Sequence, residues 1–308
     1  MRRRLFLVAP LLLLGACDFE DFGSSDRYTA DFHYGPYKLK PGGRISVENL
    51  NGSIEISGWD QDTVEISGVK YAGTPELLKA LKIDVVEGPD SVHIRTIRPS
   101  ERRGNLGAKY VIKVPRKTEL ERITSSNGAI RVSDTEAPAR LRTSNGAIHA
   151  TNLKGNLDAQ TSNGGIEVLD LEGSANLRSS NGRIHGEGVH GAFEASTSNG
   201  GINVHLAKAD SGRPIKLDTS NGSIDLTLDS ANQNDVIAST SNAGITVRMP
   251  PSIAARVKAH TSNASISSDF DVQVQGTISK HSLEGTIGSG GPLLDLSTSN
   301  GGIRLQKL

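Results

Sequence analysis

A short motif that recurs at nearly constant intervals constrains the fold of this chain more than any other feature. Four intervals of 18 residues are followed by intervals of 22, 21, 21 and 37. Periods of this length are the signature of repeat architectures, in which each unit packs only against its neighbours. A weaker copy precedes the series at Asn51, and residues 283–287 are the candidate for a degenerate copy within the long last interval. The motif Ser/Thr-Ser-Asn-Gly/Ala-x-Ile occurs nine times, with its asparagine at Asn127, Asn145, Asn163, Asn181, Asn199, Asn221, Asn242, Asn263 and Asn300.

Hydrophobic and polar residues alternate within each repeat. Isoleucine stands three residues after the asparagine, as at Ile166, and a mostly small or apolar residue follows two positions later, as at Val168. A mostly polar position separates them, as at Glu167, and leucine or alanine usually stands four residues before the asparagine, as at Leu141. Alternation with a period of two is typical of strands with one buried face. Each repeat therefore predicts two short strands joined at the asparagine turn.

The position of the insertions favours a solenoid over an antiparallel meander or β-sandwich. The extra residues of the longer repeats fall in the turn opposite the asparagine, at 208–214 and 229–234. Insertions at one corner are expected of stacked coils. Asn-Gly also closes antiparallel hairpins, but here the motif marks only every second turn. We therefore expect an all-β, single-stranded parallel β-helix (a β-solenoid), right-handed, with coils of 18–22 residues.

In such a solenoid the Asn-Gly turns stack on one another. Both residues tolerate positive φ, which suits a tight turn. Asparagine side chains about 4.8 Å apart can hydrogen-bond along the stack. The nine motif asparagines are therefore predicted to form a structural turn ladder, and a polar binding stripe is the alternative.

The region before the repeats predicts less regular coils with one helix. Thr74 suits a helix N-cap and Pro75 the first helical position, so a helix is expected over 74–81. We expect residues 31–120 to form N-terminal coils and a cap, and residues 121–308 to form the regular solenoid. Alternating residues predict strands in the first of these regions at 44–48, 53–56, 63–66, 91–94 and 109–114.

The start of the chain has the features of a lipoprotein export signal. Residues 2–4 are arginine and residues 5–14 are apolar apart from one proline, a stretch shorter than the roughly 20 residues that span a bilayer. The segment Leu14-Gly15-Ala16-Cys17 resembles the lipobox of bacterial lipoproteins, which implies cleavage before Cys17 and acylation of it. Cys17 is the only cysteine, so an internal disulfide is excluded. We expect a signal peptide at 1–16, a lipid-anchored tether at 17–30, and an extracytoplasmic location at the inner or outer membrane.

Further motifs, taken together, resemble one bacterial family. They are the segment 41–47 (Pro-Gly-Gly-Arg-Ile-Ser-Val), the segment 51–60 around Trp59, Val114-Pro115, and the Ser-Asn-Gly-x-Ile series. They are similar to a β-strand-repeat domain of unknown function whose members carry the description "putative adhesin", over roughly residues 35–308. The resemblance implies a β-helical fold at the cell envelope, with no catalytic residues and no established ligand.

Composition excludes some classes of function. The chain has 34 basic and 34 acidic residues, and without the three signal-peptide arginines 31 basic residues stand against 34 acidic ones. The resulting net charge of −3 offers no sign of the basic face that nucleic acid requires. Aromatic residues make up only 4% of the chain, which suits a thin core.

Motifs for catalysis or metal binding are not recognisable in the sequence. His149 and His185 share an outward column but lie two coils apart, roughly 10 Å, too far to ligate one zinc. A polysaccharide-active enzyme needs two carboxylates about 5–10 Å apart, whereas Glu167 and Asp225 lie three coils apart, roughly 14 Å. Trp59 suits packing at a sheet corner. We therefore expect no enzyme, no cofactor and no metal.

Two kinds of function remain open. One is a membrane-anchored adhesin-like or interaction module, with an envelope protein or polysaccharide as partner. The other is a structural or assembly element of the envelope. Leu308 follows Asn300 by only eight residues, so we expect residues 302–308 to form an exposed edge strand. Arg304 and Lys307 would protect that edge, and we expect a monomer.

Overall fold

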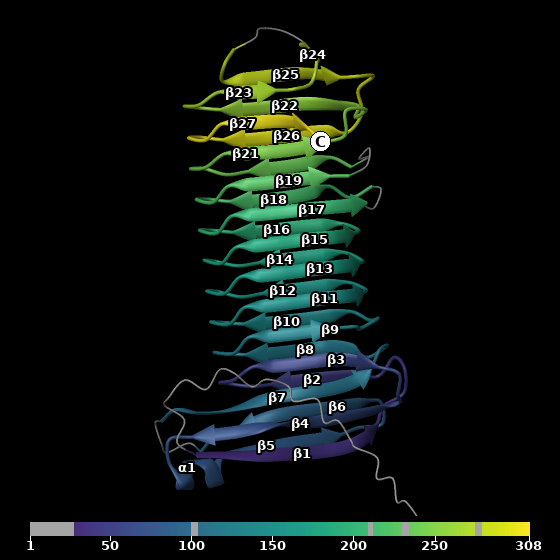
Figure 1. Cartoon of the computed structure of the whole chain (residues 1–308), viewed down its shortest axis with the longest axis vertical. Helices are drawn as coiled ribbons and strands as arrows, with labels where there is room; N and C mark the ends of the chain where they lie inside the picture. Colours follow the sequence, from purple (N-terminus) through teal and green to yellow (C-terminus); the bar gives the residue numbers. More distant parts are fainter. Residues whose placement is uncertain (1–27, 100–103, 209–211, 230–233, 275–278) are drawn as a thin grey trace, which may run out of the picture.

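The computed structural model describes residues 28–99, 104–208, 212–229, 234–274 and 279–308. These residues form two long sheets that lie face to face along one column of stacked coils (Figure 1). They also form a single short helix. Sheet A has 13 strands and sheet B has 14 in the described part of the chain. The expected signal peptide and residues 17–27 of the expected tether lie outside the described residues. Residues 28–30 already belong to the first strand, β1 (Tyr28–Lys38).

Each regular coil contributes one strand to sheet B, an asparagine turn, and one strand to sheet A. Neighbouring coils pair in parallel and in register, so that Ile148 lies opposite both Ile130 and Ile166. Parallel pairing along both sheets confirms the β-solenoid and excludes the meander. The sheet B strands are β8 (Glu119–Ser125), β10 (Ala139–Thr143), β12 (Leu157–Gln160), β14 (Ala175–Arg178), β16 (Phe193–Thr197), β18 (Ile215–Thr219) and β20 (Val236–Ser239). The sheet A strands are β9 (Ile130–Ser133), β11 (Ile148–Lys154), β13 (Ile166–Glu172), β15 (Ile184–His190), β17 (Ile202–Lys208), β19 (Ile224–Leu228) and β21 (Ile245–Met249).

The core is a thin layer of stacked apolar columns between the two sheets. The motif isoleucines form one column on sheet A, and all are almost completely buried except Ile266 in the last coil of the column, which is half-buried. Their neighbours on sheet B are leucine and alanine, such as Leu141 and Ala159. The one large aromatic in the regular coils, Phe193, packs over Gly186, where a Cβ would lie 3.2 Å from its ring. Large and small residues therefore compensate across the layer, as close packing requires.

The glycine of the motif is required for a different reason from the one expected. Among the described residues with positive φ, none is a motif asparagine of the nine regular copies or the glycine that follows it, so the expected use of positive φ is wrong for these turns. A Cβ on Gly146 would instead overlap the carbonyl oxygen of Gly128 in the preceding coil. The turns stack so closely that a side chain at this position meets the neighbouring backbone. Positive φ occurs at the opposite corner, at Asp134, Asn152 and Asp170.

The N-terminal end is closed by antiparallel strands. The coil formed by β2 (Arg44–Glu48) and β3 (Ile54–Trp59) stacks on β8 and β9. The next coil in sequence, β6 (Ser91–Ile97) and β7 (Leu106–Pro115), lies outside it. Outside these again, β4 (Thr63–Ala72) pairs antiparallel with β7, β5 (Lys82–Glu87) with β6, and β1 with β4. All five expected strands are present, whereas β1 and β5 were not predicted.

The expected helix is present beside this cap as α1 (Pro75–Ala80). Thr74 is its N-cap, and the Thr74 Oγ1 accepts a hydrogen bond from the Leu77 N–H at 3.3 Å. Leu77 and Leu81 are buried in a small cluster with Ala72 and Leu106.

The C-terminal end differs from the expectation. β22 (Ala255–Thr261) and β23 (Ile266–Ser268) skip one coil position, and β26 (Leu293–Thr298) and β27 (Ile303–Lys307) fill the gap. β27 is therefore paired on both sides, with β21 and β23, so the expectation of an exposed edge at 302–308 is wrong. The candidate degenerate copy at 283–287 is also wrong, because β25 (Ser282–Ile287) pairs antiparallel with β22 and with β24 (Val272–Val274). Equivalent motifs fit equivalent slots, so sequence order does not fix stacking order.

Candidate functional site

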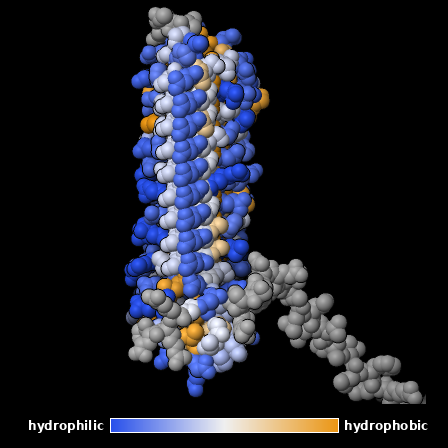
Figure 2. Space-filling view, turned by 90° about the vertical axis from the view of Figure 1, so that its left-hand side faces the viewer, coloured by the Kyte–Doolittle hydropathy of each residue, from blue (hydrophilic) through white to orange (hydrophobic). Residues whose placement is uncertain are grey.

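The motif asparagines form a continuous line along one edge of the column. Figure 2 faces this edge and shows it as a straight polar stripe. Each Asn Nδ2 donates to the Oδ1 of the neighbouring asparagine at 2.6–2.9 Å. Asn51 stands at one end of the line, and Asn300 lies between Asn242 and Asn263. The geometry is that of a ladder whose side chains are exposed to solvent.

A second ladder inside the same turn was not predicted. The Thr161 hydroxyl accepts a hydrogen bond from the Gly164 N–H at 3.2 Å and donates to the Gly146 carbonyl of the preceding coil at 2.8 Å. A buried serine or threonine stands at this position in every regular coil. The sequence indicated this ladder only by a serine or threonine at a position that, from the alternation of apolar and polar residues, faces the core. Equivalent bonds to the preceding coil are made by Ser125, Thr143, Ser179, Thr197, Thr219, Thr240, Thr298 and Thr261.

The outward column of sheet A brings together residues that the sequence treated singly. Register places His149, Glu167, His185 and Asn203 on successive coils. The His149 Nδ1 lies 2.8 Å from the Glu167 Oε2, and the His185 Nε2 lies 3.7 Å from the Glu187 Oε2. Each histidine therefore has its own carboxylate partner, and the two do not face each other.

Beside this column runs a row of very small residues that one arginine interrupts. The position two residues after the asparagine is alanine, glycine or serine in eight of the nine copies and arginine at Arg183. The neighbouring coils have Gly165 and Gly201 there, so the surface is hollowed on both sides of Arg183. The two hollows, of about 390 and 330 Å³, share Arg183 and Asn203 as lining residues. We call them together the sheet A groove. Its lining residues run from Ala147 to Asp225 and come from five coils, roughly 19 Å at about 4.8 Å per coil.

Arg183 is the arginine in the middle of the sheet A groove. Its side chain is exposed, and no described carboxylate lies within ion-pair distance of it. The acidic residues of the groove have other partners, since Glu167 pairs with His149 and Asp225 lies 3.7 Å from Arg248. In the sequence, Arg183 stands out because its copy of the motif is the one of nine without a small residue at this position.

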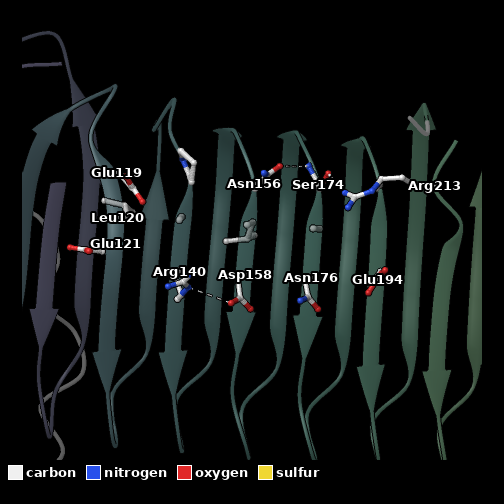
Figure 3. Close-up of a pocket in the computed structure, with 15 residues that line it drawn as sticks. Glu119, Leu120, Glu121, Arg140, Asn156, Asp158, Ser174, Asn176, Glu194 and Arg213 are labelled. Atoms are coloured by element: carbon white, nitrogen blue, oxygen red, sulfur yellow. Dashed lines mark hydrogen bonds and ion pairs between the residues drawn. The ribbon is translucent and has the colours of Figure 1, made fainter. Parts of the chain in front are cut away.

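The opposite face carries a second groove, of about 390 Å³, across β8 to β16 of sheet B (Figure 3). One wall is a row of charged and polar side chains that includes Arg140, Asp158 and Glu194, and Arg213 lies across the other wall. Asp158 and Glu194 are neutralised within the protein, whereas Arg213 is exposed and donates a hydrogen bond to the Ser174 hydroxyl at 3.5 Å, with no described carboxylate within ion-pair distance. Asp158 lies 3.6 Å from Arg140, and Glu194 lies 3.4 Å from Lys216.

A buried polar network lies at the inner side of the N-terminal cap. Thr96 Oγ1 donates to the Asn49 Oδ1 at 2.9 Å, which leaves the Tyr110 hydroxyl to donate to Thr96 Oγ1 at 2.6 Å. Burial raises the pKa of Tyr110 above its ordinary value. Asn49 and Thr96 stand at the positions of the hydroxyl ladder in the first two coils, so this network continues that ladder.

Trp59 and the neighbouring Asp60, from the motif at 51–60, make contacts that stabilise the fold. The Trp59 Nε1 donates to the Thr63 carbonyl at 2.8 Å, and the Lys113 ammonium lies 5.4 Å from its ring centroid. Nearby, the Arg116 guanidinium hydrogen-bonds to Asp60 and holds the pKa of that carboxyl below its ordinary value. Cys17 lies outside the described residues.

Searches of the described residues for metal and membrane features were negative. They contain no group of three or more His, Cys, Asp or Glu side chains placed to hold a metal ion. They contain no helix long and apolar enough to cross a membrane.

Comparison with known proteins yields similar structures and no similar sequences. No protein-family model matches the chain, and no curated protein matches it. A "putative adhesin" from Parabacteroides distasonis has 10% identity and a TM-score of 0.39, with 92% of this chain and 98% of that chain covered. A "putative adhesin" from Parabacteroides merdae has 8% identity and a TM-score of 0.35, with 91% and 96% covered. A "putative cell adhesion protein" from Clostridium sporogenes has 12% identity and a TM-score of 0.24, with 91% and 100% covered. These descriptions name no ligand.

Proposed function

We propose that this chain is a lipid-anchored, non-catalytic adhesin-like module of the bacterial envelope, whose sheet A groove binds an acidic polysaccharide. The observation that carries the proposal is Arg183, an exposed guanidinium without a described carboxylate partner at the centre of an open groove. The groove on sheet B is less suited to an acidic ligand, because both of its arginines have partners within the protein: Arg140 lies 3.6 Å from Asp158, and Arg213 donates to the Ser174 hydroxyl at 3.5 Å.

The chemistry of the sheet A groove supports a ligand that carries carboxylates on polar rings. A guanidinium binds a carboxylate through two parallel hydrogen bonds, which makes arginine a specific anchor for such groups. Gly165 and Gly201 allow a ring to approach the backbone on either side of Arg183. Asn203 offers an amide donor and acceptor to hydroxyl groups. Because the groove runs along the stacked coils, it suits an extended polymer better than a compact small molecule.

Anchoring through Cys17 would hold this surface on the extracytoplasmic side. Two or more acyl chains give stable membrane attachment. The described column begins at Tyr28, so only the segment after Cys17 separates it from the lipid. We place the module at the inner or outer membrane, facing an envelope or extracellular polymer.

Binding of the purified full chain, with Cys17→Ser for solubility, tests the proposal. The probe is polygalacturonate, and dextran is the neutral comparison. We expect binding to polygalacturonate and none to dextran. Arg183→Ser should weaken the binding at least about tenfold, since one charged hydrogen bond contributes about 1.5 kcal/mol or more. Serine stands at the equivalent position two coils away, Ser223, so the variant should fold.

The matched control is Arg142→Ser on sheet B, which also removes one exposed arginine. Arg142 lies 3.4 Å from Asp158 and outside both grooves. This variant should bind as the parent does. Equal losses in the two variants would mean that net charge, and not the groove, governs binding. If the parent does not bind polygalacturonate, the proposed ligand class is wrong.

The alternative function, a structural or assembly element, rests on a separate feature. That feature is the coil of β26 and β27, which lies between the coils β20–β21 and β22–β23. It does not involve Arg183.

A further inference from the structure

The coil formed by β26, the Asn300 turn and β27 occupies an internal slot of the column. We call it the inserted coil. β26 pairs with β20 on one side and β22 on the other, and β27 pairs likewise with β21 and β23. The chain therefore builds both walls of the slot, continues through β24 and β25, and only then fills the slot.

The strand pairing of the inserted coil connects it to other coils and not to the segment that precedes it. In the described chain, β25 pairs with β22 and β24, and not with β26. The side chains follow the same rule, because Asn300 bonds to Asn242 and Asn263, and Thr298 Oγ1 donates to the Ala243 carbonyl. All of these bonds could form equally with the walls of another copy. The covalent connection at 288–292 is what makes them intramolecular.

That connection has the features of a hinge. Gly288 and Gly290 have positive φ, 59° and 79°, and every residue from 288 to 292 is exposed or half-buried. Hinges are short segments that absorb large changes of φ and ψ. A change here would redirect the inserted coil without disturbing any buried side chain of the hinge.

At the described ends of the column, another chain could pair with only one side of an edge strand. At the N-terminal end, the antiparallel strands β1 and β5 form the edges, outside β4 and β6. At the other end, β24 and β25 cap sheet B, and the sheet A edge strand β23 has only three residues. The short edge strand β23 and the covered edge of β22 are protected against pairing with another chain, whereas β1 (11 residues) and β5 (six residues) each leave one side open. The slot of the inserted coil is therefore the site where a second chain can gain full parallel pairing on both sides.

We propose that the inserted coil is exchangeable, and that two copies of this chain form a dimer by donating their inserted coils to each other's slots. Such exchange gives a closed, two-fold symmetric dimer. The intramolecular arrangement is favoured at low concentration, because a short linker gives an effective concentration in the millimolar range. Dimers form when the slot opens at high local protein concentration, as on a crowded membrane.

Mixing two single-cysteine chains tests the exchange. One full chain carries Ser241→Cys and the other Ser299→Cys, both with Cys17→Ser. Ser241 and Ser299 stand on adjacent coils, where the Asn300 N–H donates to the Ser241 carbonyl at 3.0 Å. Coils about 4.8 Å apart suit a disulfide. The two thiols can stack only if the inserted coil of one chain enters the slot of the other. The chains are refolded together at high concentration and oxidised, and the interchain disulfide is measured.

The control mixture joins Ser198→Cys and Ser220→Cys chains in the same background. These serines also stand on adjacent coils, as the bond from the Asn221 N–H to the Ser198 carbonyl shows, but they lie in the uninterrupted middle of the column. We expect at least about tenfold more interchain disulfide in the first mixture. The double variant Ser241→Cys plus Ser299→Cys should form the disulfide within one chain, which verifies the geometry. Equal yields in the two mixtures, or no interchain disulfide in the first, would overturn the proposal.

Discussion

Thr161 and Asn163 stand two residues apart in the same turn, one buried and one exposed. The Thr161 hydroxyl satisfies a buried N–H and a carbonyl of the neighbouring coil, whereas the Asn163 amide bonds to other side chains in contact with water. We expect Thr161→Val to lower the free energy of unfolding by about 2–3 kcal/mol, because two backbone groups lose their partner. Asn163→Ala should cost about 1 kcal/mol. Denaturant melts of the two variants measure the difference, and the reverse ranking would contradict this account.

Tyr110 links stability to alkaline pH. Burial raises its pKa in the folded protein, so the neutral form is favoured there relative to the unfolded chain. Its contribution is complete below the ordinary tyrosine pKa of about 10 and is lost as the pH rises above that value. Tyr110→Phe should cost about 1 kcal/mol at neutral pH, from the lost bond to Thr96. It should also reduce the decline in stability above pH 10. Melts at pH 7 and pH 10.5 test both effects, and an unchanged alkaline decline would exclude Tyr110 as its source.

Individual residues also show which contacts could be predicted from the sequence and which could not. The stacking of the asparagines followed from the fixed period, but the role of Gly146 did not, because its requirement comes from the backbone of the neighbouring coil. The bonds of Thr161 depend on the same approach between coils. Arg183 was recognisable only as a departure from a column of small residues, and its importance depends on the hollows around it.

At the scale of elements, alternation predicted the strands and failed to predict their order at the ends. The coils β22–β23 and β26–β27 carry equivalent motifs, and Ile266 and Ile303 both belong to the Ile245 column. Any of these coils fits any of these slots, so local pattern does not decide the sequence of stacking. The order depends on the capping strands β24 and β25, whose antiparallel pairing occupies the outer edge of β22.

The position of β27 reverses the expected role of its charges. Arg304 lies between Thr246 and Ser267 in an internal strand, and the Lys307 ammonium lies 5.6 Å from the Phe270 ring centroid. Neither residue guards an open edge. We expect Arg304→Ser plus Lys307→Ser to leave the sedimentation coefficient unchanged at micromolar concentration, because removing them exposes no strand. New self-association of the double variant would show that these charges protect the surface after all.

At the scale of the whole molecule, the described column ends in the antiparallel strands β1 and β5 on one side, and in the short strands β23 and β24 on the other. Repeat proteins derive their stability from contacts between neighbouring units, and here the hydroxyl and asparagine ladders add bonds between the same neighbours. None of these end strands continues the in-register parallel pairing of a full regular coil. The two grooves lie on the long faces of the column.

Membrane attachment is the last property that the sequence predicts for the whole chain. Each buried methylene of an acyl chain contributes about 0.8 kcal/mol, so several chains on Cys17 would give stable attachment. We expect Cys17→Ser to abolish incorporation of a palmitate analogue and to move the protein from the membrane fraction to the soluble extracytoplasmic fraction. The control is Cys17→Ser plus Ser24→Cys, which restores a thiol seven residues further along but not the Leu-Gly-Ala-Cys context. If the lipobox directs acylation, this control should remain unlabelled. Labelling of Cys17→Ser equal to that of the parent would contradict lipidation at Cys17, because the chain has no other cysteine.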